Sequence, residues 1–205
     1  MENKGKVFGF HRALDTAGAA VGPFTALLFL YFYPGQYKWL FIISVSPGII
    51  AISLTFLLKD KQKHASTRKS PGFFAFLMYW KQSPKKFRFL VVGLLAFALF
   101  NSSDAFLLLS IKSKGFSDSY MIGVYIFYNL VYALLSYPVG ILADKFGLSR
   151  ILILGIGVFA VVYSCMGFAV VTWHFAVLFG LYALYAAATE GVSKALISNI
   201  VQKDK

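Results

Sequence analysis

Six long apolar runs, separated by short polar or basic stretches, dominate this chain of 205 residues. A helix needs roughly 20 apolar residues to cross a bilayer, and each run is about that long. Only 14% of the residues are charged, against about 25% in a typical soluble domain. No run alternates with a period of two, so helices are favoured over a barrel. The sequence predicts an all-α integral membrane protein with six transmembrane helices, over Thr16–Tyr33, Leu40–Leu58, Phe89–Ile111, Tyr120–Ala143, Ile151–Val171 and Phe175–Val201.

Lysine and arginine are concentrated on one side of these six runs. They lie in the N-terminal segment, the 59–88 loop, the 144–150 loop and the C-terminus, whereas the opposite loops hold only Lys38, Lys112 and Lys114. Because cytoplasmic loops carry the positive excess, we expect a multi-pass protein of the cell membrane with both termini in the cytoplasm. The same flanking pattern explains the net charge of +12 without nucleic acid as a partner.

The basic 59–88 loop contains an apolar stretch, Pro71–Trp80, that is too short to span a bilayer. It suits a helix lying along the membrane surface, with Tyr79 and Trp80 at the depth of the lipid headgroups, or equally a partly buried linker. The sequence shows no nucleotide-binding loop, and its three histidines lie apart from one another. We therefore expect no metal, no cofactor and no enzymatic activity.

The stretch GILADKFGLSR, residues 140–150, joins two of the predicted spans. Gly147 permits a tight turn there, and Lys145 and Arg150 suit the cytoplasmic surface. Asp144 can pair with these two cations or with the N-terminus of a neighbouring helix. This stretch, from Gly140 to Arg150, resembles the cytoplasmic loop signature of the major facilitator superfamily.

The stretch GAAVGP, residues 18–23, opens the first apolar run and resembles the fifth-helix motif of proton-coupled exporters in that superfamily. Gly18 and Gly22, four residues apart, would let two helix backbones approach closely, and Pro23 favours a kink. Ordinary helix packing is the alternative, since this glycine spacing is common in membrane helices.

The resemblance implies that the chain corresponds to helices five to ten of a twelve-helix transporter. Residues 1–58 would end the N-terminal half, residues 59–88 would form the cytoplasmic central loop, and residues 89–205 would begin the C-terminal half. A complete member would be about twice as long, so the chain looks like a fragment or truncated product that would not transport alone.

The implied activity is transport of a small molecule by alternating access, with the bilayer, the substrate and protons as partners. The fifth-helix motif favours proton-coupled export. Import of a metabolite by a related member is the close alternative, and a six-span subunit that transports nothing is a further one.

Charged residues within spans mark candidate functional sites because they are costly in lipid. Asp104, with Asn101 one turn earlier on the same predicted helix face, is the candidate for proton coupling or contact with a cationic substrate, or else makes a structural hydrogen bond. Glu190 and Lys194 are spaced to pair on one face of the last span, as a gate or as a static pair.

Two further groups complete the candidate residues. Arg12 and Asp15 flank the start of the first predicted span and suit a structural role or a cytoplasmic gate. Polar and aromatic side chains at helical spacing predict cavity walls, with core packing as the alternative; they are Tyr125, Asn129, Tyr132, Tyr182 and Tyr185.

Overall fold

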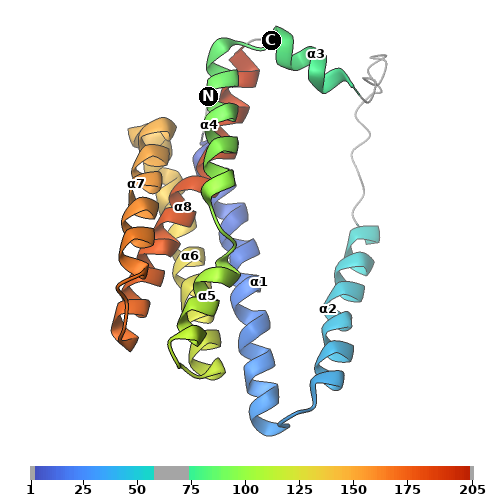
Figure 1. The fold of residues 1–205 in the computed structure, drawn as a ribbon. Coiled ribbons are helices and arrows are strands. Elements are labelled where there is room, and N and C mark those ends of the chain that lie inside the picture. The colour runs from blue at the N-terminus through green and yellow to red at the C-terminus, as the bar shows by residue number, and fades with distance from the viewer. Residues whose placement is uncertain (1–2, 58–73, 204–205) are drawn as a thin grey trace. The chain divides into compact units, whose positions relative to one another are not determined.

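The structure is a computed structural model that describes residues 3–57 and 74–203. All regular structure in this part of the chain is helical (Figure 1). The helices are α1 Lys4–Phe32, α2 Tyr37–Leu57, α3 Ala75–Gln82, α4 Lys85–Phe100, α5 Asp104–Ser113, α6 Asp118–Phe146, α7 Leu148–Met166 and α8 Thr172–Lys203.

The chain divides into two compact units. The large unit comprises Met1–Leu27 and Lys85–Lys205, and therefore holds most of α1 together with α4–α8. Its helix α8 packs against α6 and α7 over most of their length, and aromatic side chains fill the interior, among them Tyr128, Phe175, Phe179 and Tyr182. The small unit, Leu28–Pro84, holds the end of α1 with α2 and α3, and no described side chain of α2 is buried.

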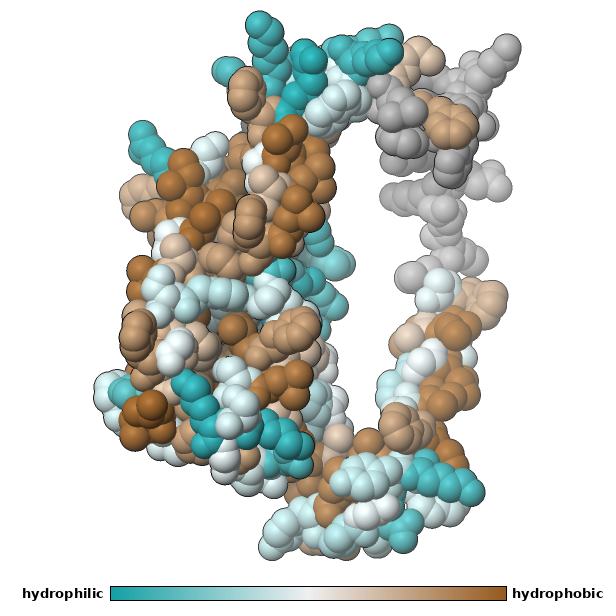
Figure 2. All heavy atoms as spheres, in the orientation of Figure 1, coloured by the Kyte–Doolittle hydropathy of each residue, from teal (hydrophilic) through white to brown (hydrophobic). Residues whose placement is uncertain are grey.

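The outer surface of the large unit is apolar where a soluble protein would be polar. Leu99 and Phe100 of α4 and Leu134 of α6 are 85%, 83% and 74% exposed. Figure 2 shows brown apolar side chains over much of this unit, with teal hydrophilic side chains gathered toward its ends. Six helical segments in the described residues are long and apolar enough to cross a membrane, which confirms the predicted all-α, six-span fold.

The junction of α6 and α7 shows how the 140–150 stretch turns. Gly147 has a φ of +106°, which other residues rarely adopt, and its N–H donates to the carbonyl of Ala143 at 3.0 Å. Helix α7 therefore begins at Leu148, directly after the glycine. The predicted tight connection between two spans is present.

The third predicted span differs from the expectation of one continuous helix. Residues 101–103 are non-helical and separate α4 from α5, so Asp104 begins a second helix instead of interrupting the first. Ser103 is the N-cap of α5, and its hydroxyl accepts from the N–H of Ala105 at 3.4 Å. Serine and aspartate favour helix starts, and here they outweigh the apolar periodicity around them.

Other boundaries also shift. Helix α1 starts at Lys4, twelve residues before the predicted Thr16, and it continues through Pro23. Helix α7 ends at Met166, before the predicted Val171, and α8 takes up the expected turn at residues 172–174. Residues 58–73, including the start of the expected surface helix, lie outside the described residues, but α3 is a helix within the rest of that stretch. Its place at the membrane surface stays a prediction, as does the division at residues 58 and 88.

Candidate functional site

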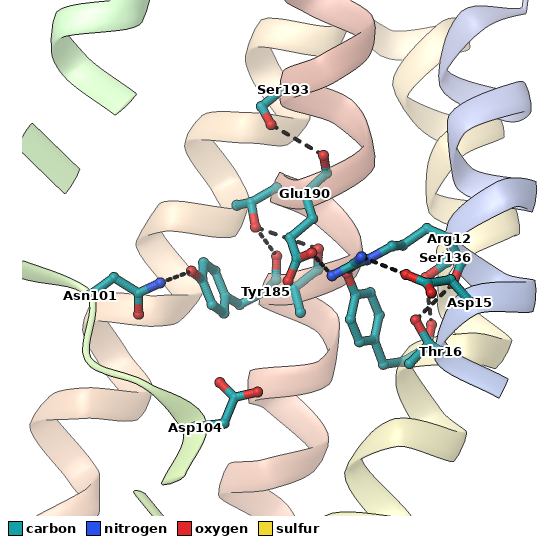
Figure 3. A network of polar contacts seen from close by, with 12 residues as sticks. Arg12, Asp15, Thr16, Asn101, Asp104, Ser136, Tyr185, Glu190 and Ser193 are labelled. Carbon is teal, nitrogen blue, oxygen red and sulfur yellow. Dashed lines mark hydrogen bonds and ion pairs between the residues drawn. The ribbon is translucent and has the colours of Figure 1, made fainter. Parts of the chain in front are cut away.

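Arg12 of α1 is the centre of a polar network that joins three helices of the large unit. Its guanidinium donates to the hydroxyl of Tyr132 on α6 at 2.6 Å and to the carboxylate of Asp15 at 2.8 Å. It also forms an ion pair with Glu190 of α8 (Figure 3). The side chain of Arg12 is 26% exposed and that of Glu190 is 38% exposed, so this link is partly shielded from solvent. It is an electrostatic connection between α1 and the α6–α8 bundle.

A second network fixes the break between α4 and α5. The amide of Asn101 donates to the hydroxyl of Tyr185 on α8 at 3.1 Å, and Ser102 shares a hydrogen bond of 2.7 Å with Tyr163 on α7. The broken span is therefore held by hydroxyl groups from both neighbouring helices. These contacts satisfy polar groups that a continuous helix would have paired within its own backbone.

Asp104, the first residue of α5, faces α8. The phenol of Tyr182 donates to its Oδ1 atom at 2.7 Å. In the described part of the chain no other hydrogen bond and no ion pair reaches this carboxylate. The side chain is partly exposed.

The N-terminus of α1 meets the α6 end of the loop stretch. The backbone N–H groups of Gly5 and Lys6 each donate to the carboxylate of Asp144 at 2.8 Å. A carboxylate at this position accepts hydrogen bonds from N–H groups that have no partner within the first turn of the helix. Its negative charge is also stabilised by the positive end of the helix dipole. The helices approach closely here, because a Cβ added at Gly5 would lie 2.6 Å from the carbonyl oxygen of Gly140.

Two adjoining clefts open beside the broken span, and both include Asn101. The first, of about 580 Å³, is lined by residues 101–105 with Leu108 and Tyr125. The second, of about 170 Å³, lies between apolar side chains of α4 and α7 and the polar residues Tyr185, Thr189, Glu190 and Ser193 of α8. Among the described residues, each cleft is lined by one carboxylate and neither is lined by lysine or arginine.

The sequence profile of the Major Facilitator Superfamily matches residues 1–205. The chain belongs to the major facilitator superfamily. It is 29% identical over 206 residues to an uncharacterized MFS-type transporter of Methanocaldococcus jannaschii, and the match covers 98% of this chain and 50% of that protein. The chain therefore spans about half the length of this curated relative. No solved structure matches it.

Membership of the superfamily confirms the resemblance drawn from the two motifs, and the six-span fold fits part of the superfamily fold. It also points to a membrane transporter rather than an enzyme. Within the described residues no group of histidine, cysteine, aspartate and glutamate could hold a metal ion.

Three expectations about charged and polar residues need correction. Glu190 pairs with Arg12, and in the described residues no ion pair joins it to Lys194, which is exposed. The reason is that the carboxylate of Glu190 pairs with the guanidinium of Arg12, which comes from another helix. Asn101 does not share a helix face with Asp104, because the chain is non-helical between them. Asp15 does not lie at a helix start, since α1 begins at Lys4.

The fifth-helix motif also behaves differently from the expectation. No atom of another described helix lies within 4 Å of a Cβ added at Gly18 or Gly22. The close approach in this chain uses Gly5 and Gly9, which are likewise four residues apart, against α6. The same small-residue spacing was thus present earlier in the helix and could have been found in the sequence.

The predicted cavity-lining residues separate into two groups. Tyr125 lines the first cleft and Tyr185 the second. Asn129, Tyr132 and Tyr182 are at most 4% exposed and lie in the packed interior. Their helical spacing places them on the buried face of each helix. Polar and aromatic residues are tolerated on such a face when their hydrogen bonds are satisfied.

Two residues that the sequence reasoning missed tie the broken span to α7. The hydroxyl of Tyr163 shares a hydrogen bond with Ser102 in the broken span. Nothing in the sequence around Tyr163 distinguishes it from other aromatic residues. Lys114 donates to the carbonyls of Met166 and Gly167 at 3.4 and 3.3 Å and to that of Ala169, at the end of α7. A cation among the last carbonyls of a helix is favourable, but its partner helix was not evident from the sequence.

Proposed function

We propose that this chain supplies one part of a transporter that moves a small molecule across the cell membrane by alternating access, coupled to protons. The supporting observation is the Arg12–Glu190 ion pair, which joins α1 to α8. By the family correspondence, these helices belong to opposite halves. An ion pair between the halves stabilises one access state and must break when they separate.

In this proposal the cytoplasmic gate consists of Arg12, Asp15 and Glu190. Asp15 and Glu190 bind different nitrogens of the same guanidinium, so Arg12 keeps a carboxylate partner after Glu190 leaves it. That retained partner lowers the cost of opening, because an unpaired charge within the membrane is expensive. The cap that Asp144 provides for α1 adds a second contact that opening would break.

Asp104 is the proposed proton carrier. It lines an open cleft, one of its oxygens has no hydrogen-bond partner among the described residues, and it lies within an apolar span. Ionisable residues inside a membrane are often members of proton pathways, which supports this role. Asn101 and Tyr182 hold the surrounding chain in place.

Export with proton entry is the direction we propose, because of the GAAVGP stretch at residues 18–23. The alternative is import with proton entry. We also propose that both termini are cytoplasmic, since the start of α1 and the last turns of α8 lie beside the basic 144–150 loop.

The test does not require knowledge of the substrate. The complete transporter that includes this chain is reconstituted in proteoliposomes, which are loaded with a mixture of small polar and amphiphilic solutes of each charge, and the outside is acidified. Loss of a solute from the lumen, measured by mass spectrometry against protein-free liposomes, is the expected result. Accumulation of a solute added outside indicates import instead. If no solute moves in either direction, the transport proposal is wrong.

Two variants give that experiment its control. Asp104→Asn removes the proposed proton carrier and should abolish proton-driven movement. Asp118→Asn makes the same change at an exposed carboxylate that pairs with Lys112, outside both clefts, and should not alter it. Equal movement by both variants would remove Asp104 from the mechanism.

A further inference from the structure

We infer that the phenol of Tyr132 is a second, uncharged contact that closes the proposed cytoplasmic gate, beside the ion pair of Arg12 with Glu190. This inference rests on the proposed function and adds a residue to its gate. Three features of the phenol support it. It binds a nitrogen of Arg12 that neither carboxylate uses, its position is fixed by packing, and its hydroxyl has no other hydrogen bond among the described residues.

The guanidinium of Arg12 has three nitrogens, and each has a different partner. Its Nε atom donates to the hydroxyl of Tyr132 at 2.6 Å. Its Nη1 atom donates to Asp15 at 2.8 Å, and its Nη2 atom pairs with Glu190 (Figure 3). An arginine side chain presents its donors in a fixed planar fork, so the three contacts exist side by side. Loss of one partner leaves the other two in place.

The three partners divide between the two sides of the gate. Asp15 lies on α1, the same helix as Arg12, and stays with it. Tyr132 lies on α6 and Glu190 on α8, and these two helices pack closely against each other. By the family correspondence, α6 and α8 belong to the half opposite α1. Opening of the gate must therefore break the contact with Tyr132 as well as the ion pair.

The phenol is held in place before Arg12 reaches it. Tyr132 is 2% exposed, and its ring lies beside that of Tyr128, with 5.9 Å between the two centroids. The side chain of Glu190, in contrast, is 38% exposed. A packed side chain loses little conformational entropy when it accepts a hydrogen bond, whereas an exposed glutamate loses more. The phenol is therefore the preorganised contact of the two.

The bonding of the phenol favours the closed gate. Within the described residues its hydroxyl takes part in one hydrogen bond, the one that Arg12 donates. A buried hydroxyl without a partner is costly, and hydrogen bonds to charged groups are stronger than those between neutral groups. The Tyr132 ring also lies 5.4 Å from the guanidinium carbon, within the range of a cation–π contact. Separation of α1 from α6 gives up these interactions together.

The two closing contacts differ in their response to salt. Arg12 and Glu190 carry opposite charges at partly exposed positions, and dissolved ions screen such an attraction. The hydrogen bond to Tyr132 has one neutral partner, so screening affects it much less. The phenol therefore keeps the gate partly closed under conditions that weaken the ion pair.

The experiment measures opening of the gate in the complete transporter that includes this chain, reconstituted in nanodiscs. Spin labels are attached at Val7→Cys and Phe146→Cys, two exposed positions on α1 and at the end of α6, after every other cysteine has been replaced. Double electron–electron resonance gives the populations at short and long distance. Tyr132→Phe keeps the ring and removes the hydroxyl, and it should raise the ratio of long to short distances by about tenfold.

Tyr128→Phe is the matched control. Tyr128 is also a buried tyrosine of α6, at 3% exposed, and no described group forms a hydrogen bond with its hydroxyl. This variant should leave the distance ratio unchanged. An unchanged ratio in Tyr132→Phe, or an equal rise in both variants, would overturn the inference, because the contact with Arg12 would then not hold the gate.

Salt distinguishes a separate contact from a phenol that acts only through the ion pair. Raising the ionic strength from about 0.1 M to about 1 M shortens the Debye length from about 10 Å to about 3 Å and should raise the ratio in the unchanged gate. Tyr132→Phe should keep this response, and Glu190→Gln should lose it. Loss of the response in Tyr132→Phe would also overturn the inference.

The outcomes separate this inference from the proposed function. If Glu190→Gln opens the gate and Tyr132→Phe does not, the ionic gate stands and the inference fails. If both variants open it but proteoliposomes move no solute, the two contacts stand and the transport proposal fails.

Discussion

Arg12 on α1 and Glu190 on α8 form an ion pair that joins the first and last helices of the described chain. Tyr132 orients the guanidinium from the side at 2.6 Å, with its ring centroid 5.4 Å from the guanidinium carbon. The pair is partly exposed, so its strength is moderate and its breaking is compatible with a reversible conformational change.

The Glu190→Gln variant should loosen the contact between α1 and the bundle. Spin labels at Val7 and Phe146, both exposed, would report the distance between α1 and the end of α6. Losing the pair costs about 1 kcal/mol, so the population at longer distance should rise about fivefold. Glu190→Asp, which keeps the charge, is the control. An unchanged distance distribution in Glu190→Gln would show that the pair does not hold the helices.

The Asp144→Ala variant should destabilise the protein by removing the cap of α1. Two charge-assisted hydrogen bonds to Gly5 and Lys6 are lost, at a cost of about 1–2 kcal/mol. Thermal unfolding in detergent should shift down by several degrees, about 2–4 °C for each kcal/mol. Asp118→Ala, at an exposed ion pair, should shift it less. Equal shifts would mean that the cap contributes nothing beyond a surface charge.

Two glycines of α6 provide a matched test of close helix packing. A Cβ at Gly140 would lie 2.9 Å from the carbonyl carbon of Gly5, whereas no atom of another described helix lies within 4 Å of one at Gly123. Gly140→Ala should therefore cost about 1–3 kcal/mol through forced separation of α1 and α6. Gly123→Ala should be neutral or slightly stabilising, because alanine favours helices. Both effects are read from the thermal unfolding midpoint, and a tolerated Gly140→Ala would refute the tight contact.

Membrane orientation can be tested by cysteine labelling in a Cys165→Ser background. Ser149 lies at the α6–α7 junction and Ser119 near the start of α6, and both are exposed. A membrane-impermeant maleimide applied to intact cells should label Ser119→Cys and not Ser149→Cys. The positive residues around the junction are the physical reason. Labelling of Ser149→Cys alone would reverse the proposed orientation.

Much of the fold could be predicted from the sequence because lipid imposes a simple rule. A run of about 20 apolar residues in a bilayer must pair its backbone groups internally, so hydropathy alone locates the helices. The turn at Gly147 was also evident, since a glycine between two spans permits the positive φ that it adopts. The break before Asp104 could have been found from the Asn101–Asp104 stretch, where serines precede an aspartate as at a helix start.

The partners of the charged residues were decided only by the tertiary structure. Spacing along one helix favoured an ion pair between Glu190 and Lys194, but Glu190 pairs with Arg12 from another helix. Helices α1 and α8 meet only after the chain packs, and local periodicity contains no information about which helices become neighbours. By itself the sequence determined that this chain is built of six membrane-spanning helices and which residues are costly to bury. Packing alone determined which of those costly groups neutralise one another and that, among the described residues, Tyr182 is the partner of Asp104. The physical reason is that ion pairing within a membrane depends on distances between helices and not on spacing within one.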